Sequence, residues 1–167
     1  LCLADSSVTD ISGLKGKNFA FTDRYSTSGY IVPLLLFRDR GLVPDSFFGI
    51  TFFVGKHDVV IEALKARSVD GGAVSSGTLA NAEAVEGNVF RVLASSEPIP
   101  LDAIAAGKRV PQEHVKLLQE VLRRLPPDSA PVEAVRVHLK WPAAGFAVLG
   151  DSFYDPLRRA LGISSGD

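Results

Sequence analysis

The chain has 167 residues, of which 46% are hydrophobic and 22% charged, and its formal net charge is −1. This balance is typical of a globular protein with one sizeable core or two small lobes. A near-neutral charge without a basic stripe argues against nucleic acid or an anionic membrane as partner. The longest apolar runs, such as residues 31–37, are far shorter than the roughly 18–20 residues that span a bilayer.

Cysteine and methionine are scarce. The single cysteine, Cys2, excludes an internal disulfide and a cysteine-based metal site. It lies in the apolar run 1–4, where we expect a buried strand cysteine. Methionine is absent, also at position 1, so we expect a chain that was processed or cut from a longer one. A signal segment would already be gone.

Residues 19–41 are expected to form a strand, a polar loop and a helix. Phe19-Ala20-Phe21 is apolar and suits a short buried strand, and residues 23–27 form a polar loop. Ser28 is expected to cap a helix that starts at Gly29. Gly41 suits the left-handed position that ends this helix.

Ser26, Thr27 and Ser28 place hydroxyl groups where the strand meets the helix. The first N–H groups of a helix have no intrahelical partner, and the macrodipole puts about half a positive charge there. Because Gly29 lets a ligand approach the backbone, the arrangement predicts a cup for a tetrahedral oxyanion. Hydroxyl residues before a helix are also common as simple caps, and these residues alone leave that alternative open.

Strands and helices alternate up to Ser95. This alternation predicts an α/β fold with a mainly parallel sheet. Besides the strands at 1–4 and 19–21, the expected elements are strands at 47–54, 68–74 and 88–95, helices at 58–67 and 79–85, and a loop at 42–46.

Polar loops follow the strands at residues 26–28, 56–57 and 75–78. Ligands of parallel sheets bind beyond the carboxyl ends of the strands, so we expect these loops to face one crevice. His57 is a candidate ligand contact by this position, and its second ring nitrogen would need a partner to fix the tautomer. His114 and His138 have charged neighbours and are expected at the surface.

The sequence changes character after Ser95. Residues 97–100 contain two prolines and are expected to form a stiff extended crossing. The elements expected beyond it are a helix from Pro111 to Leu125, a loop at 128–131, a loosely alternating, strand-like segment at 135–141, and a last helix capped by Asp151 or Ser152.

Common catalytic motifs are absent, including the nucleophile elbow, the Walker loop and the zinc-protease helix. An enzyme acting on a phosphate ester remains an alternative, for which His57 with Asp58 or Asp70 is the candidate set. The histidines lack metal-ligand spacing. We therefore expect no catalysis, no metal and no cofactor.

Several motifs together resemble one family. They are Leu14-Lys15-Gly16-Lys17-x-Phe19-Ala20-Phe21, Ser26-Thr27-Ser28-Gly29-Tyr30 with Pro33, Gly55-x-His57, Val69-Asp70-Gly71-Gly72-Ala73-Val74 and Ile99-Pro100-x-Asp102. Their order and spacing resemble the phosphonate and phosphite substrate-binding proteins of ABC transporters. The match is clearest over residues 1–104 and fainter beyond.

This resemblance implies a type II periplasmic-binding fold, with helices on both faces of the sheet and two lobes that close on a ligand. Residues 1–98 would form lobe two with its hinge strands, and residues 99–167 a segment that returns towards lobe one. The ligand contacts it implies are Tyr25, Ser26, Thr27, Ser28, Gly29, His57, Ser75 and Asp102.

In this family pattern, Ser26, Thr27 and Ser28 hold the phosphoryl oxygens and His57 donates a further hydrogen bond. Asp102 would meet an ammonium group on an aminoalkylphosphonate, or it is only a turn residue after Pro100. Some members carry a further acidic residue near the position of Gly77, where this chain has none. The departure favours phosphite, phosphate or methylphosphonate as ligand.

The implied partners are a small phosphorus oxyanion and the membrane subunits of an ABC transporter, in the periplasm or another extracytoplasmic space. A sensing domain of the same fold, coupled to a signalling partner, is the alternative. Members of the family are longer at the N-terminus, so we expect this chain to lack the first part of lobe one. A homodimer is one way to bury the apolar surface that would then be left uncovered.

Overall fold

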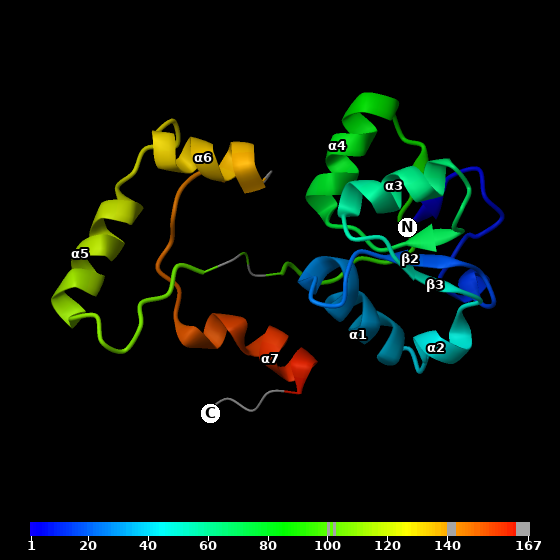
Figure 1. Ribbon diagram of the computed structural model, residues 1–167, viewed down its shortest axis with the longest axis horizontal. Coiled ribbons are helices and arrows are strands. Elements are labelled where there is room, and N and C mark those ends of the chain that lie inside the picture. Colours follow the sequence, from blue (N-terminus) through cyan, green and yellow to red (C-terminus); the bar gives the residue numbers. More distant parts are fainter. Residues whose placement is uncertain (100, 102, 140–142, 163–167) are drawn as a thin grey trace. The chain divides into compact units, whose positions relative to one another are not determined.

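The computed structural model describes residues 1–99, 101, 103–139 and 143–162 (Figure 1). The chain divides into two compact units, of which unit 1 comprises Leu1–Ile99 and Leu157–Asp167 and unit 2 comprises Pro100–Pro156. None of the described helices is long and apolar enough to cross a membrane. The assignment of residues 1–98 and 99–167 to two lobes stays a prediction.

A parallel sheet forms the centre of unit 1. Its strands are β2 (Phe19–Phe21), β3 (Thr51–Phe53) and β4 (Gly71–Gly72), in the order β3-β2-β4. Both neighbours of β2 run parallel to it, with Phe19 opposite Thr51 on one side and Gly71 on the other. The expected parallel sheet is therefore confirmed. Strand β2 has the predicted bounds, whereas β3 and β4 are shorter than predicted.

Successive side chains of β2 point to opposite faces of the sheet, and each face is covered by helices. Phe19 and Phe21 belong to the core cluster that contains Phe37 of α1 (Val32–Arg38) and Phe47 of α2 (Pro44–Phe47). Ala20 belongs to the cluster on the other face, built on α3 (His57–Lys65). In Figure 1, α3 and α4 (Ser76–Glu86) lie on one side of the sheet and α1 and α2 on the other, which confirms the layered α/β fold.

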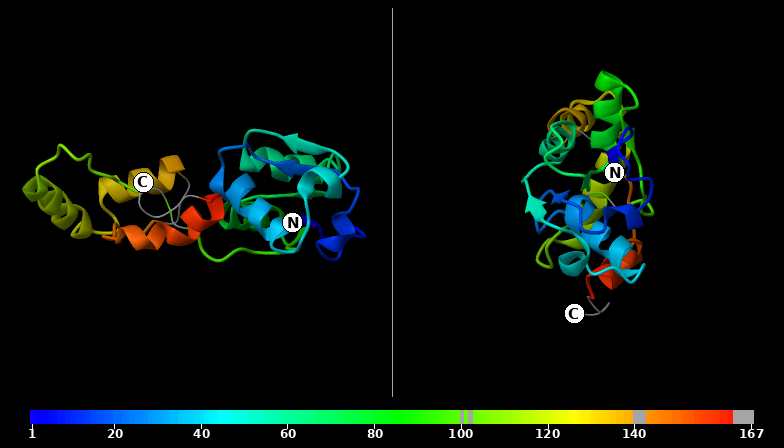
Figure 2. Two further views of the ribbon diagram at one scale, coloured as in Figure 1. Left: turned by 90° about the horizontal axis from the view of Figure 1, so that it is seen from below. Right: turned by 90° about the vertical axis from the view of Figure 1, so that its right-hand side faces the viewer.

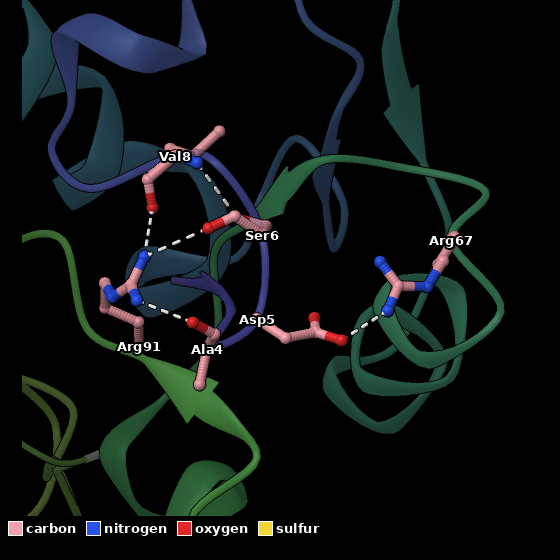
Figure 3. A network of polar contacts seen from close by, with 6 residues as sticks. All are labelled: Ala4, Asp5, Ser6, Val8, Arg67 and Arg91. Carbon is pink, nitrogen blue, oxygen red and sulfur yellow. Dashed lines mark hydrogen bonds and ion pairs between the residues drawn. The ribbon is translucent and has the colours of Figure 1, made fainter.

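A second, two-stranded sheet pairs the start of the chain with the end of the α/β segment. Strand β1 (Cys2–Leu3) is antiparallel to β5 (Phe90–Arg91), and Cys2 is buried as expected. The guanidinium of Arg91 donates to the carbonyl oxygens of Ala4 at 2.5 Å, Ser6 at 3.3 Å and Val8 at 2.6 Å (Figure 3). Arg91 therefore holds the turn after β1 in place, before the short helix η1 (Ser12–Leu14).

Several expected boundaries in unit 1 were wrong. Residues 44–47 form α2 instead of a loop and the start of a strand, because Pro44 suits a first helical turn and Phe47 packs against Phe37 in the core. Helix α4 starts earlier than predicted because Ser75 caps it. The strand expected at 88–95 is short and pairs with β1 outside the parallel sheet. The helix end at Gly41 is confirmed by its φ of 69°.

Unit 2 is built from helices in the part that the structure describes. It contains α5 (Gln112–Arg123), α6 (Ala130–Leu139) and η3 (Asp151–Tyr154), which Figure 2 shows from two further directions, and α7 (Asp155–Leu161) begins in it. The helix after Pro111 is confirmed. The loop expected at 128–131 is confirmed at residues 128–129 and was wrong at 130–131, which belong to α6. The strand-like segment at 135–141 was wrong up to Leu139, because Val132 is buried on a helical face and Arg136 bonds Glu133 one turn away.

Candidate functional site

The turn after β2 is held by its own polar groups. The carboxylate of Asp23 accepts the N–H of Tyr25 at 2.8 Å, and the carbonyl of Asp23 accepts the N–H of Ser26 at 3.2 Å. The Ser26 hydroxyl then accepts the N–H of Gly29 at 3.0 Å and so caps the helical segment. Ser28 was expected to be this cap, which was wrong, because extended backbone at Ser26 already starts the helix at Thr27.

The first turn of this segment is wider than an α-helix. Helix η2 (Thr27–Ile31) is a π-turn, in which the carbonyl of Ser26 accepts the N–H of Ile31 at 3.0 Å. Single π-turns are frequent at functional sites. Gly29 is buried in this turn, and a Cβ at this position would collide with the side chain of Thr22. The glycine is thus required by the close approach of the turn to the end of β2.

His57 links the two other polar loops to this turn. It is the first residue of α3, and its Nε2 lies 3.4 Å from Oγ of Ser28. Its Nδ1 accepts the backbone N–H of Ser75 at 3.1 Å. Residues that follow three different strands, Ser28 after β2, His57 after β3 and Ser75 after β4, therefore meet at the carboxyl edge of the parallel sheet.

The contact with Ser75 determines which nitrogen of His57 carries the proton. Since Nδ1 accepts an N–H, the neutral ring is protonated at Nε2, the atom that faces Ser28. Burial lowers the pKa of His57, and the nearby carboxylates of Asp58 and Asp23 partly oppose this effect. At neutral pH, His57 is therefore an uncharged hydrogen-bond donor.

Helix α4 also begins at this site. The hydroxyl of Ser75 accepts the N–H of Thr78 at 3.2 Å and lies 2.9 Å from the hydroxyl of Thr78. The first turns of α4 and η2 contain no acidic residue, so no side-chain charge there offsets the positive end of the helix. The site therefore combines hydroxyl groups, one neutral imidazole and the N-terminal N–H groups of helices.

The remaining candidate residues lie elsewhere or outside the described part. The side chain of Tyr25 is 92% exposed at the tip of the turn. Asp102 lies outside the described residues. The carboxylate of Asp70 accepts the N–H of Asn18 at 2.9 Å, at the opposite edge of the sheet from His57, so these two residues do not form a pair.

Sequence reasoning missed two residues of this site. Thr78 was included only as the end of a loop, and its contact with Ser75 follows once Ser75 is seen as a helix cap. Thr22 directly follows β2, is 1% exposed and packs under Gly29. The signal for Thr22 is a hydroxyl at a position that continues a buried strand.

The sequence of the chain matches a known protein family. A sequence model of the family described as "ABC transporter, phosphonate, periplasmic substrate-binding protein" matches residues 2–154. The chain belongs to this family. Members of the family are substrate-binding transport proteins of the periplasm, which are not enzymes.

Several solved structures share the fold of this chain. A binding protein component of an ABC phosphonate transporter from Pseudomonas aeruginosa is 21% identical, with a TM-score of 0.71. The match covers 96% of this chain and 54% of that chain. PhnD1 from Prochlorococcus marinus, in complex with methylphosphonate, is 21% identical, with a TM-score of 0.65. The match covers 93% of this chain and 60% of that chain. The periplasmic aliphatic sulphonate-binding protein SsuA from Escherichia coli is 16% identical, with a TM-score of 0.53. The match covers 98% of this chain and 50% of that chain.

These identities establish the fold, which is that of type II periplasmic binding proteins. The chain spans about half the length of the solved proteins that it matches.

Proposed function

We propose that this chain binds a phosphorus oxyanion as part of the substrate-binding component of an ABC-type import system. The observation that carries the proposal is the meeting of Ser28, His57 and Ser75 where three helical segments begin. Hydroxyls, a neutral imidazole and the N–H groups at helix N-termini are all donors to the oxygens of a phosphonate, phosphite or phosphate. Family membership favours import over coupled sensing, with transporter membrane subunits as partners in the periplasm.

Each residue has a distinct part in this proposal. The hydroxyls of Ser26, Thr27 and Ser28 donate to the phosphoryl oxygens, and His57 donates through its Nε2–H. Ser75 orients His57 with its N–H, and its hydroxyl adds a donor at the start of α4. Hydrogen bonds from neutral donors can hold an anion without a cationic side chain.

Three further residues are proposed at the margin of the ligand. Gly29 brings the turn close to the end of β2, and its N–H is already bonded to Ser26. The exposed ring of Tyr25 is available to cover a bound ligand. Asp102 would meet an ammonium group, if the ligand carries one.

The ligand that fits this proposal best is small or has a neutral tail. The first turn of α4 has no carboxylate that could meet an ammonium group. The complex of PhnD1 with methylphosphonate shows that a protein of this fold takes such a ligand. Phosphite, phosphate and methylphosphonate are therefore the first candidates, ahead of 2-aminoethylphosphonate.

We propose binding without catalysis. A serine nucleophile would need a base, but the nitrogen of His57 that faces Ser28 carries a proton in the neutral ring. Asp70, which could have oriented the imidazole, is bonded to Asn18 instead. The Ser28–His57 pair is therefore arranged to donate hydrogen bonds and not to remove a proton.

Isothermal titration calorimetry with phosphite, phosphate, methylphosphonate and 2-aminoethylphosphonate tests the proposal. We expect saturable binding of at least one of the first three, with sulfate as the reference anion. Thr27→Val keeps the shape of a half-buried side chain and removes a donor, so it should weaken binding by about 1.5–3 kcal/mol. Thr9→Val, at an exposed threonine of the same unit, is the matched control.

Two outcomes would contradict the proposal. Absence of heat with every phosphorus ligand would reject the site. Equal affinities of Thr27→Val and Thr9→Val would mean that the turn only caps a helix.

A further inference from the structure

Thr22 joins the end of the central strand to the proposed oxyanion site. Its backbone N–H donates to the carbonyl of Gly29 at 3.3 Å, and its carbonyl accepts the N–H of Gly55 at 2.7 Å. Thr22 therefore connects the turn after β2 with the turn after β3, which are the turns that carry Ser28 and His57.

The hydroxyl of Thr22 is buried without a partner. The residue is 1% exposed, and no described residue forms a hydrogen bond with its Oγ1. A buried hydroxyl without a partner destabilises a protein, and valine, of the same shape, would avoid this cost. The presence of threonine at this position therefore requires an explanation.

The surroundings of this hydroxyl indicate where a partner would come from. Of the Thr22 atoms, Oγ1 lies nearest to the position that a Cβ on Gly29 would occupy. The hydroxyl therefore lies directly against the turn of the proposed site. The N–H of the same glycine is bonded to the hydroxyl of Ser26. Gly29 is thus contacted by two hydroxyls, of which only that of Ser26 has a partner.

The turn above Thr22 can also rearrange. It is a π-turn, with the carbonyl of Ser26 accepting the N–H groups of both Tyr30 and Ile31 at 3.0 Å. A shift between these two bonds changes the width of the turn without breaking the helix. Such a shift would move Ser26 relative to Thr22, whose backbone N–H stays bonded to the carbonyl of Gly29.

We propose that Thr22 is a positioning residue of the oxyanion site, whose hydroxyl gains a hydrogen bond to the Ser26–Gly29 turn when the anion binds. The inference rests on the proposed function. Ser26 is the partner that fits, because its oxygen can accept from Thr22 while its own O–H donates to the anion. The acceptor role strengthens the donation from Ser26, since hydrogen bonds in a chain polarise one another.

Two substitutions separate this role from a purely structural one. Thr22→Val removes the hydroxyl and keeps the shape, so it should raise the Tm of the free protein and lower its affinity for the anion by about tenfold. Thr22→Ser keeps the hydroxyl and removes a methyl group, so it should lower the Tm and leave the affinity within about twofold of the original. A structural residue would move stability and affinity in the same direction.

Ser129 offers a matched control. Its Oγ is the other buried side-chain atom without a partner among the described residues, and it lies in unit 2. Ser129→Ala should raise the Tm without changing the affinity.

The experiment is titration calorimetry with methylphosphonate and inorganic phosphate, and scanning calorimetry without ligand, on the original chain and the three variants. Weaker binding by Thr22→Val with retained binding by Thr22→Ser supports the proposal. If the original chain binds and Thr22→Val binds equally well, or Thr22→Ser loses binding, only the role of Thr22 is overturned. If the original chain binds neither ligand, the proposed function fails for these anions and the role of Thr22 fails with it.

Discussion

The two units of this chain obtain their structure in different ways. In unit 1, the rings of Phe19, Phe21 and Phe48 lie within 4.5–6.2 Å of one another and belong to a continuous core. In the described part of unit 2, Val132 is the one apolar side chain that is buried, while Leu117 and Leu118 of α5 are 60% and 47% exposed. Stability therefore resides in unit 1, and unit 2 depends on local helix formation and a few polar contacts.

The largest expected difference between the units is in the cost of removing an apolar side chain. Phe21→Ala should reduce the free energy of unfolding by about 3–5 kcal/mol, because the ring is 1% exposed and contacts Phe19, Tyr30 and Phe53. Leu118→Ala should cost about 0.5 kcal/mol or less, since the side chain is half exposed and alanine favours a helix. Urea denaturation followed by circular dichroism measures both.

Equal costs for Phe21→Ala and Leu118→Ala would break the comparison, because they would show that α5 buries Leu118 in solution.

A smaller effect is expected for the arginine that ties unit 2 together. The guanidinium of Arg136 donates to the carbonyls of Ala143 and Pro127 and to the carboxylate of Glu133. Arg136→Met should lower the protection of α6 amides against hydrogen exchange by about 1.5–3 kcal/mol and leave β2 unchanged. The exposed pair Arg67–Asp5 of unit 1 is the control, since Arg67→Met should cost at most about 1 kcal/mol (Figure 3).

A loss of protection that is equal in α6 and β2 would mean that the two units unfold together, which would contradict the difference in stability between them.

The sequence was sufficient for the alternation of strands and helices in unit 1, except for α2. Alternating Phe19-Ala20-Phe21, the glycine after α1 and the hydroxyls before α4 are local signals, and the structure follows them. Boundaries were less certain where tertiary packing decided them. Phe47 has a high strand propensity but lies in α2, because a helical turn brings its ring to Phe37.

The candidate site was predictable in its loops but not in its bonds. Because loops that follow parallel strands lie at the same edge of the sheet, the sequence predicted that the loops of Ser28, His57 and Ser75 meet there. Which serine caps the turn and which atom fixes His57 depend on backbone angles and on contacts between residues far apart in the chain. The burial of Thr22 under Gly29 likewise follows only from the packing of the turn on the strand.

The smallest expected difference between the units concerns pH. Burial lowers the pKa of His57 below its ordinary value of 6.5, so the unfolded chain binds this proton more readily than the folded chain. Stability from His57 is therefore complete above pH 6.5 and decreases as the pH falls from there towards the folded pKa. A charged ring would also lose the bond from the Ser75 N–H, because Nδ1 would then carry a proton.

His57→Asn keeps an acceptor for that N–H but does not titrate. Between about pH 7.5 and about pH 5.5, a range that brackets the ordinary pKa of histidine, the Tm of this variant should therefore fall less than the Tm of the original chain. His114→Asn, at an exposed histidine of unit 2, should follow the original chain, and identical pH profiles for all three proteins would place His57 in water instead of at the site.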